Sequence, residues 1–225
     1  MQPIPRSSLR QQVYAQLREG IRAGRFQPSD RLREEDIAAT LQVSRTPVRE
    51  ALSQLASEGL LEPRAKGGYV LPEITPDDVA EIFELRLLLE PHAARRAATE
   101  LSDSDLAALE RTLASEGIAH RDGEIAAFIA ANAEFRRILF GTIGRRLRQC
   151  IVNFDDHVQS IRLLTLHDPA TQRIVMSGQQ RLLAALRARD PDAAEQAMRT
   201  HDLAARHCIE AHFVERTADA SSFRR

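Results

Sequence analysis

The sequence predicts a mostly α-helical protein in which a small N-terminal unit, built of three helices and a β-hairpin, precedes an all-α helical bundle. Apolar residues recur at helical spacing along almost all of the chain, strand-like runs are confined to residues 60–74, and no strand-like alternation follows. The composition, 43% hydrophobic and 28% charged over 225 residues, is that of a folded globular protein and excludes a disordered or collagen-like chain.

The N-terminal unit begins with a helix predicted at residues 8–23, because residues spaced by four positions share one apolar stripe: Leu9, Val13, Leu17 and Ile21. Residues 34–41 predict a short second helix. A third helix is expected to begin after Ser44, as its N-cap, and to end at Gly59. Residues 60–74 then carry two short apolar runs around an Arg-Ala-Lys-Gly-Gly tip, which is a β-hairpin pattern.

The second part of the chain is predicted to be a bundle of helices joined by short loops. Two helices begin at capping signals, a hydroxyl followed by acids in the first turn, at Thr75 and at Ser102. The predicted helices lie near residues 76–100, 103–121, 123–140, 144–164, 169–188 and 191–215. The chain therefore divides into a domain at 1–74, a domain at 75–217 and a tail at 218–225 that we expect to be mobile.

Composition and charge also limit the class of function. No run approaches the roughly 20 apolar residues of a membrane helix, and the first residues lack the apolar core of a signal peptide, so we expect a cytoplasmic protein without membrane contact. A formal charge of −1 argues against indiscriminate coating of nucleic acid, although residues 1–74 are mildly basic, with 11 Lys and Arg against 9 Asp and Glu. Cys150 and Cys208 lack metal or disulfide spacing and are expected to be buried free thiols.

Residues 34–55 have the spacing of a helix-turn-helix, two short helices locked across a tight turn by apolar side chains. On the second helix one face is apolar, and another face, about 120° away, carries Arg45, Thr46 and Arg49. Two arginines one turn apart on a helix that enters a groove by its N-terminus reach base edges or phosphates. An isolated pair of this kind is usually only a solvated helix face, so the prediction depends on the longer pattern.

The string RLREEDIAATLQVSRTPVREALSQLASEGLLEPRAKGGYV, residues 31–70, resembles the winged helix-turn-helix of GntR-type regulators. By this resemblance Arg45, Thr46 and Arg49 read the major groove, and Arg33 contacts the DNA backbone or an adjacent base. The resemblance also implies that the tip of the hairpin, the wing, approaches the minor groove through Lys66, Gly67 and Gly68. Gln42 stands at a turn position where the family usually has Gly, and Ser29 replaces the Gly expected after Pro28, so turn strain is in question.

From Ile74 onward the chain resembles the FCD-type C-terminal domain of the FadR branch of that family, through DDVAEIFELRLLLEPHAARRAA and LLAALRARDPDAAEQAMRTHDL. Such domains commonly hold a divalent metal through one Asp and three His and bind a small carboxylate beside it. Here the matching positions hold Asn132, Arg136, Gln179 and His201. One imidazole does not hold a metal that needs about four ligands, and a guanidinium repels a cation, so we expect no metal cofactor.

The same substitutions suggest a pocket that binds an anionic ligand directly. Asn132 and Arg136 lie one helical turn apart, and together with Arg86, Gln179 and His201 they are candidates for its lining. Arginine suits forked binding of a carboxylate. In the alternative interpretation Arg136 pairs with a neighbouring acid, Glu134 or Glu90, and the region is merely a core.

The sequence thus predicts a ligand-responsive repressor, a homodimer that binds a short inverted repeat in double-stranded DNA and responds to a small carboxylate effector. A second hypothesis is a DNA-binding regulator whose C-terminal domain only dimerises and binds no small effector. No nucleophile elbow, phosphate-binding glycine loop, HExxH or cysteine-based metal motif is present, so we assign no catalytic residue and expect no enzyme.

Overall fold

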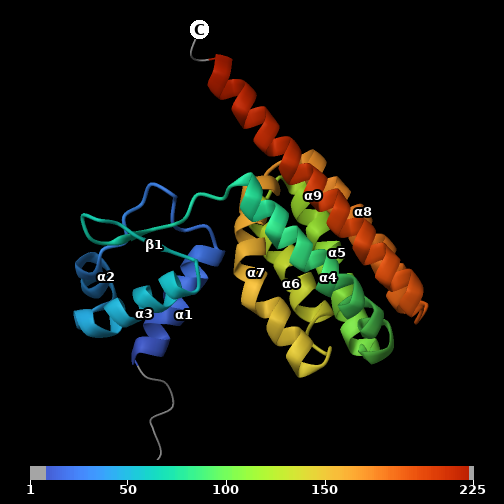
Figure 1. The fold of residues 1–225 in the computed structure, drawn as a ribbon. Coiled ribbons are helices and arrows are strands. Elements are labelled where there is room, and N and C mark those ends of the chain that lie inside the picture. Colours follow the sequence, from blue (N-terminus) through green and yellow to red (C-terminus); the bar gives the residue numbers. More distant parts are fainter. Residues whose placement is uncertain (1–8, 223–225) are drawn as a thin grey trace, which may run out of the picture. The chain divides into compact units, whose positions relative to one another are not determined.

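The computed structural model describes the backbone of residues 9–222 and the side chains as far as residue 214, and it divides the chain into two compact units after Ile74 (Figure 1). This is the boundary at which the sequence pattern changes. Each unit has its own buried apolar side chains, and each is described separately below.

The N-terminal unit contains three helices and a two-stranded antiparallel sheet, as the sequence predicts. The helices are α1 (Leu9–Arg22), α2 (Glu34–Leu41) and α3 (Arg45–Ser57), and the strands are β1 (Glu62–Pro63) and β2 (Tyr69–Val70). Glu62 pairs with Val70 and Pro63 with Tyr69, while Leu32 forms a bridge to Tyr69. The core joins α1 to α3 through Val13, Leu17, Ile21, Val48, Ala51, Leu52 and Leu55.

The turn between α2 and α3 depends on an unusual backbone conformation at Gln42. This residue caps the C-terminus of α2 with φ 54° and ψ 44°, in the left-handed region that favours glycine. Ser44 lies at the N-cap of α3 with an extended backbone, as predicted, but its side chain makes no capping hydrogen bond. The tight turn is therefore formed by a strained glutamine.

The C-terminal unit is all-helical, and its helices lie where the sequence predicts them. They are α4 (Pro76–Glu100), α5 (Asp103–Asp122), α6 (Ile125–Leu139), α7 (Arg145–Thr165), α8 (Pro169–Arg187) and α9 (Pro191–Ser222). Capping boxes start α4 at Thr75 and α5 at Ser102. In each box the hydroxyl accepts a hydrogen bond from the backbone N–H three residues on, and the aspartate at that position accepts one from the backbone N–H of the capping residue. Both units together confirm the predicted fold class.

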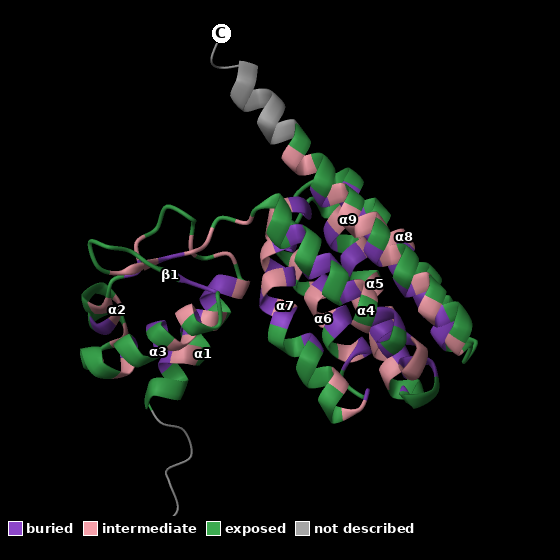
Figure 2. Ribbon diagram, viewed as in Figure 1, coloured by how far each residue is buried: buried purple, intermediate pink, exposed green. Residues whose placement is uncertain are grey.

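Packing in this unit places the buried faces of the helices inward (Figure 2). α4 packs mainly against α9, α5 against α6, and α8 against α9. No helix among the described residues is long and apolar enough to cross a membrane.

Two predictions about this unit need correction. Helix α9 continues to Ser222, so the tail predicted at 218–225 is helical over most of its length, and residues 223–225 lie outside the described part. Both cysteines are free thiols, but Cys150 is exposed and Cys208 is half-buried. The expectation of burial is wrong for Cys150 because the buried stripe of α7 runs through Ile151, Phe154 and Val158, and Cys150 lies outside it.

Candidate nucleic-acid interface and buried arginine pocket

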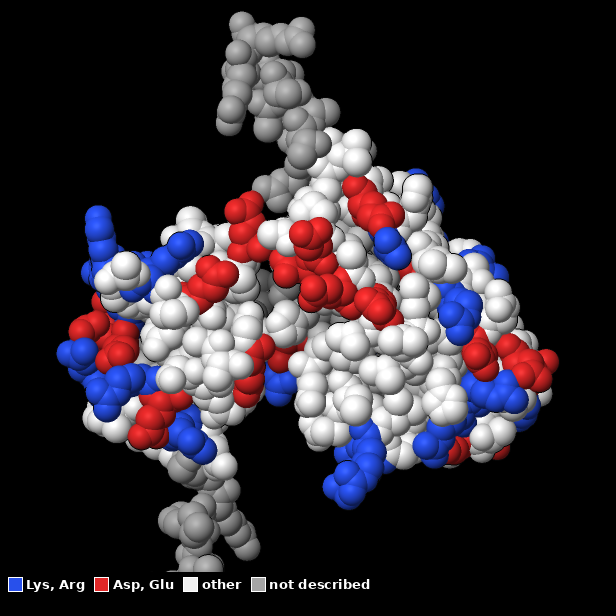
Figure 3. All heavy atoms as spheres, viewed as in Figure 1, with Lys and Arg blue, Asp and Glu red and all other residues white. Residues whose placement is uncertain are grey.

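Helix α3 presents two contrasting faces. Val48, Ala51, Leu52 and Leu55 have no exposed surface and pack on the rest of the unit. Arg45, Thr46 and Arg49 are exposed, as the helical wheel predicts. Arg33 and the wing residues Lys66 and Gly67 are exposed as well, whereas Gly68 is half-buried. Lys and Arg side chains, interspersed with acids, gather over the α2–α3 end of this unit (Figure 3).

Of Arg45, Thr46 and Arg49, Arg45 forms ion pairs with acids of α2. A terminal nitrogen of Arg45 lies 3.2 Å from a carboxylate oxygen of Glu34 and 2.8 Å from one of Glu35, both in the first turn of α2. The guanidinium remains 61% exposed, so the pairs are weak and easily exchanged for a stronger anion. The exposed guanidinium of Arg45 is therefore held beside the first turn of α2 by two acids.

The wing is held by Arg31, a residue to which the sequence analysis gave no role. Its Nε donates to the carbonyl of Gly67 at 2.7 Å, and a terminal nitrogen donates to the carbonyls of Lys66 and Gly67. Gly67 and Gly68 take φ values of 81° and 77°, and a Cβ at position 68 would lie 3.0 Å from the carbonyl oxygen of Leu32. No local pattern could identify Arg31, because its partners lie 35 and 36 residues away.

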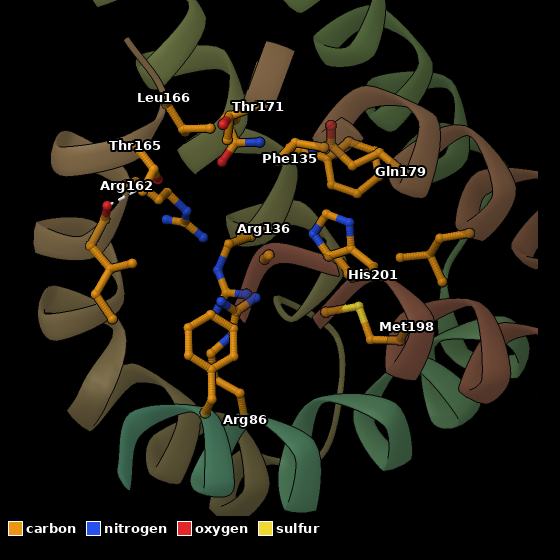
Figure 4. A pocket seen from close by; sticks show the side chains of 17 residues that line it. Arg86, Phe135, Arg136, Arg162, Thr165, Leu166, Thr171, Gln179, Met198 and His201 are labelled. Atoms are coloured by element: carbon orange, nitrogen blue, oxygen red, sulfur yellow. Dashed lines mark hydrogen bonds between the residues drawn. The ribbon is translucent and has the colours of Figure 1, made fainter. Parts of the chain in front are cut away.

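In the C-terminal unit, five helices enclose a cavity of about 40 Å³. All five predicted ligand-binding residues line it: Arg86 from α4, Asn132 and Arg136 from α6, Gln179 from α8 and His201 from α9. Figure 4 shows Arg86, Arg136 and His201 pointing toward the same central space, together with Arg162 from α7. The sequence hypothesis thus identified residues that tertiary packing brings together.

Arg136 is nevertheless bound to acids. Its two terminal nitrogens donate to the carboxylate of Glu90 at 2.5 and 2.9 Å, and its Nε donates to Asp155 at 3.2 Å. Glu90 rather than Glu134 is the partner, since Glu134 pairs with Arg137. The pairing that the alternative interpretation expected is therefore present, although Arg136 still lines the cavity.

Arg86 extends the same buried network. Its Nε donates to Glu90 at 3.1 Å and a terminal nitrogen donates to Asp202 at 2.7 Å. Burial alone would raise the pKa of Glu90, but the charges of Arg136 and Arg86 prevail and lower it to about 2. Burial and the neighbouring Glu90 raise the pKa of Asp202 to about 7. Glu90 is thus an ionised carboxylate shared between two guanidinium groups.

Arg162 is the cavity residue that sequence reasoning missed. It is 8% exposed and donates to Gln159 at 3.0 Å, and among the described residues no carboxylate lies within ion-pair distance of it. Burial, and then repulsion by Arg136, lower its pKa to about 9, so it remains charged at neutral pH. Helical spacing could have identified it, because it lies four residues after the buried Val158 of α7 and four residues before the buried Leu166, the C-cap of this helix.

A second missed residue, Glu116 of α5, lies behind Gln179. Glu116 is fully buried and accepts a hydrogen bond from Gln179 Nε2 at 2.9 Å. Burial raises the pKa of this carboxyl to about 8, so it is mainly protonated at neutral pH. Desolvation and the nearby Arg86 lower the pKa of His201 to about 3, so its imidazole is neutral. The neutral lining leaves the arginines as the main source of charge in the cavity.

The residues at the family's metal positions do not fit a divalent cation. Asn132, Gln179 and a guanidinium replace three of the expected ligands, and Arg136 would place a positive charge inside the coordination sphere. Among the described residues, no group of three or more His, Cys, Asp or Glu side chains could hold a metal.

Comparison with known proteins agrees with this division of the chain. Residues 9–71 match the model of the bacterial regulatory proteins of the gntR family, and residues 81–205 match that of the FCD domain. The chain is 28% identical over 192 residues to the uncharacterized HTH-type transcriptional regulator YdhC of Bacillus subtilis, across 84% of this chain and 86% of the relative. It is 29% identical over 198 residues to the HTH-type transcriptional repressor RspR of Escherichia coli, across 88% and 87% of the two chains.

Among solved structures, the chain is similar to that of E. coli McbR/YncC. The TM-score is 0.71 and the sequence identity 27%, and the match covers 97% of this chain and 100% of the other. The likeness therefore extends over both units rather than one.

Proposed function

The chain belongs to the GntR family of bacterial regulatory proteins, with an FCD domain as its C-terminal part, and from this premise we propose that it is a repressor that a small anionic metabolite releases from its operator. Its relatives are transcriptional regulators, and RspR, which is named a repressor, favours repression over activation. We further propose that it acts in the cytoplasm as a homodimer on a short inverted repeat, with neither a metal cofactor nor enzymatic activity.

The observation that supports DNA reading is the exposure of Arg45, Thr46 and Arg49 on α3, opposite a face with no exposed surface. Arg49 is the sharpest test. Arg49→Ala should weaken operator binding by about 1–3 kcal/mol, the value of a good base contact, without changing the melting temperature. Arg111→Ala, an exposed arginine of the C-terminal unit, makes the same change in net charge and should leave binding unchanged. Equal operator affinities of the two variants in a gel shift would remove Arg49 from the reading face.

The observation that supports an anionic effector is the cavity lined by three arginines. The pairing of Arg136 with Glu90 favours the second candidate, a C-terminal domain that only dimerises and binds no effector. Operator release decides between them: small organic and sugar acids are added to the protein–DNA complex in the presence of a chelator. Release by one acid supports the repressor–effector function. A complex that resists every acid while the protein remains dimeric supports the structural domain.

A further inference from the structure

We infer that Arg162 anchors the effector, and that the effector is a short-chain monocarboxylic acid bearing a hydroxyl group, bound without a metal. This inference rests on the proposed function only in taking the cavity to be the effector site. It moves the anchoring role from Arg136, which the sequence suggested, to a residue on α7.

The division of charges within the cavity selects Arg162. Arg136 is bound by Glu90 and Asp155, and Arg86 by Glu90 and Asp202, so both guanidinium groups have carboxylate partners in the free protein. A ligand that used either would have to displace an internal carboxylate. Among the described residues, Arg162 donates to one acceptor, the amide oxygen of Gln159 at 3.0 Å, although a guanidinium carries five N–H donors.

A buried cation without a carboxylate partner is unfavourable for folding and is rarely retained without a function. Arg162 reaches the cavity, where it points toward the central space (Figure 4). A carboxylate that enters this space would provide the forked partner that the described part of the chain does not supply. The buried charge of Arg162 is therefore best explained by a ligand whose carboxylate pairs with it.

Gln179 offers a hydrogen-bond acceptor to a hydroxyl group on the ligand. Its Nε2 donates to Glu116, but its Oε1 is buried and, in the described part of the chain, accepts no hydrogen bond. Gln179 lines the same cavity as Arg162. The carboxyl proton of Glu116 is one donor for this oxygen, and because an amide oxygen has two lone pairs, a ligand hydroxyl in the cavity would be a second.

The size and charge of the cavity limit the acid further. A volume of about 40 Å³ holds about three water molecules, which limits the acid to about two or three carbon atoms. Among the described residues that line the cavity, Arg162 is the arginine without a carboxylate partner, so the cavity can neutralise one carboxylate of a ligand. A second carboxylate would approach Glu90, Asp155 or Asp202, which face the same network. The cavity should therefore prefer monocarboxylates to dicarboxylates.

The test uses the full-length protein in excess EDTA, with melting temperature and calorimetric titration as readouts. The probes are glycolate, racemic lactate, acetate and malonate. We expect glycolate or lactate to raise the melting temperature, acetate to bind more weakly, and malonate to have no effect. Arg162→Met should weaken binding of the hydroxy acid by about 10- to 100-fold. Arg146→Met, an exposed arginine of the same helix, should bind as the wild type does.

A purely structural role for Arg162 would give a different result. Arg162→Met should then melt at a lower temperature without any acid, whereas an anchor without an internal carboxylate partner predicts no such loss. If the methionine variant fails to fold, Arg162→Lys keeps the charge but loses the forked geometry, and it should bind the acid about tenfold more weakly.

Four outcomes would overturn the inference: wild-type affinity in both Arg162 variants, tighter binding of malonate than of the hydroxy acids, loss of binding in EDTA, or no response to any probe. Operator binding is measured in parallel. If a hydroxy acid binds through Arg162 but leaves operator affinity unchanged, the role of Arg162 as anchor is supported and the proposed release of the repressor from its operator is contradicted.

Discussion

At the scale of single residues, Glu90 determines the charge arrangement of the cavity. It is fully buried and lies between Arg86 and Arg136, and the charges of both hold its pKa at about 2. Because removal of one partner leaves buried cations without full compensation, Glu90→Gln should lower the free energy of unfolding by about 3 kcal/mol in urea at pH 7.

The matched control is Glu100→Gln on the same helix. Glu100 forms an i, i+4 pair with Arg96 as Glu90 does with Arg86, but both partners are partly exposed. This pair should contribute at most about 1 kcal/mol. Equal losses in the two variants would show that Glu90 is not the shared partner described above.

Glu116 gives a prediction of pH dependence. Burial raises the pKa of its carboxyl from 4.5 to about 8, so between these values the folded protein keeps a proton that the unfolded chain releases. The stability that Glu116 contributes is therefore complete below pH 4.5 and is lost as the pH rises toward 8, by at most about 1.4 kcal/mol per pH unit.

Glu116→Gln keeps the shape of the side chain and removes this titration. The free energy of unfolding of the variant, relative to the wild type, should increase steadily from pH 5 to pH 8. Asp202, whose pKa is also raised by burial, titrates in both proteins and cancels in the difference. A difference that is independent of pH would mean that Glu116 is already ionised in the folded protein.

At the scale of elements, the turn between α2 and α3 contains a residue with a strained backbone. Gln42 has φ 54°, where a Cβ is unfavourable by about 1–2 kcal/mol and glycine is not. Gln42→Gly should stabilise the N-terminal unit by about 0.5–1 kcal/mol, after allowance for the larger entropy of glycine in the unfolded chain. Thermal unfolding measures this, and operator affinity should stay the same because Gln42 is not on the reading face.

The control is Ala39→Gly, three residues earlier in α2. Ala39 is exposed and helical, so the glycine should cost about 1 kcal/mol there. If both glycines destabilise the protein, the left-handed conformation at Gln42 is not strained.

At the scale of the whole molecule, the chain has two units with separate cores, and the cavity belongs to one of them. A hydroxy acid at about 100 times its dissociation constant adds about 2.7 kcal/mol to the stability of the unit that binds it. Hydrogen exchange of the full-length protein should therefore slow in α4, α7 and α9 on addition of the acid. Exchange in α1 and α3 should be unchanged, and equal protection of both units would contradict binding within the C-terminal unit alone.

The sequence by itself determined the order of the helices, most of their limits, the hairpin and the two faces of α3, because these depend on local periodicity and capping. Thr75 and Ser102 started helices as their neighbours predicted, and Arg45, Thr46 and Arg49 lie on the exposed face. The family pattern also identified five residues that line one cavity.

Only the tertiary structure decided which charges face one another. Arg136 acquired Glu90 from another helix, Arg31 acquired the carbonyls of the wing, and Arg162 was left with no carboxylate within reach in the described part of the chain. These partners lie far apart in sequence, and a pairing between charges depends on distance and burial rather than on spacing along the chain. For that reason the sequence could predict a pocket for an anion, but the fold was needed to distinguish the arginine that remains available from the two that are already paired.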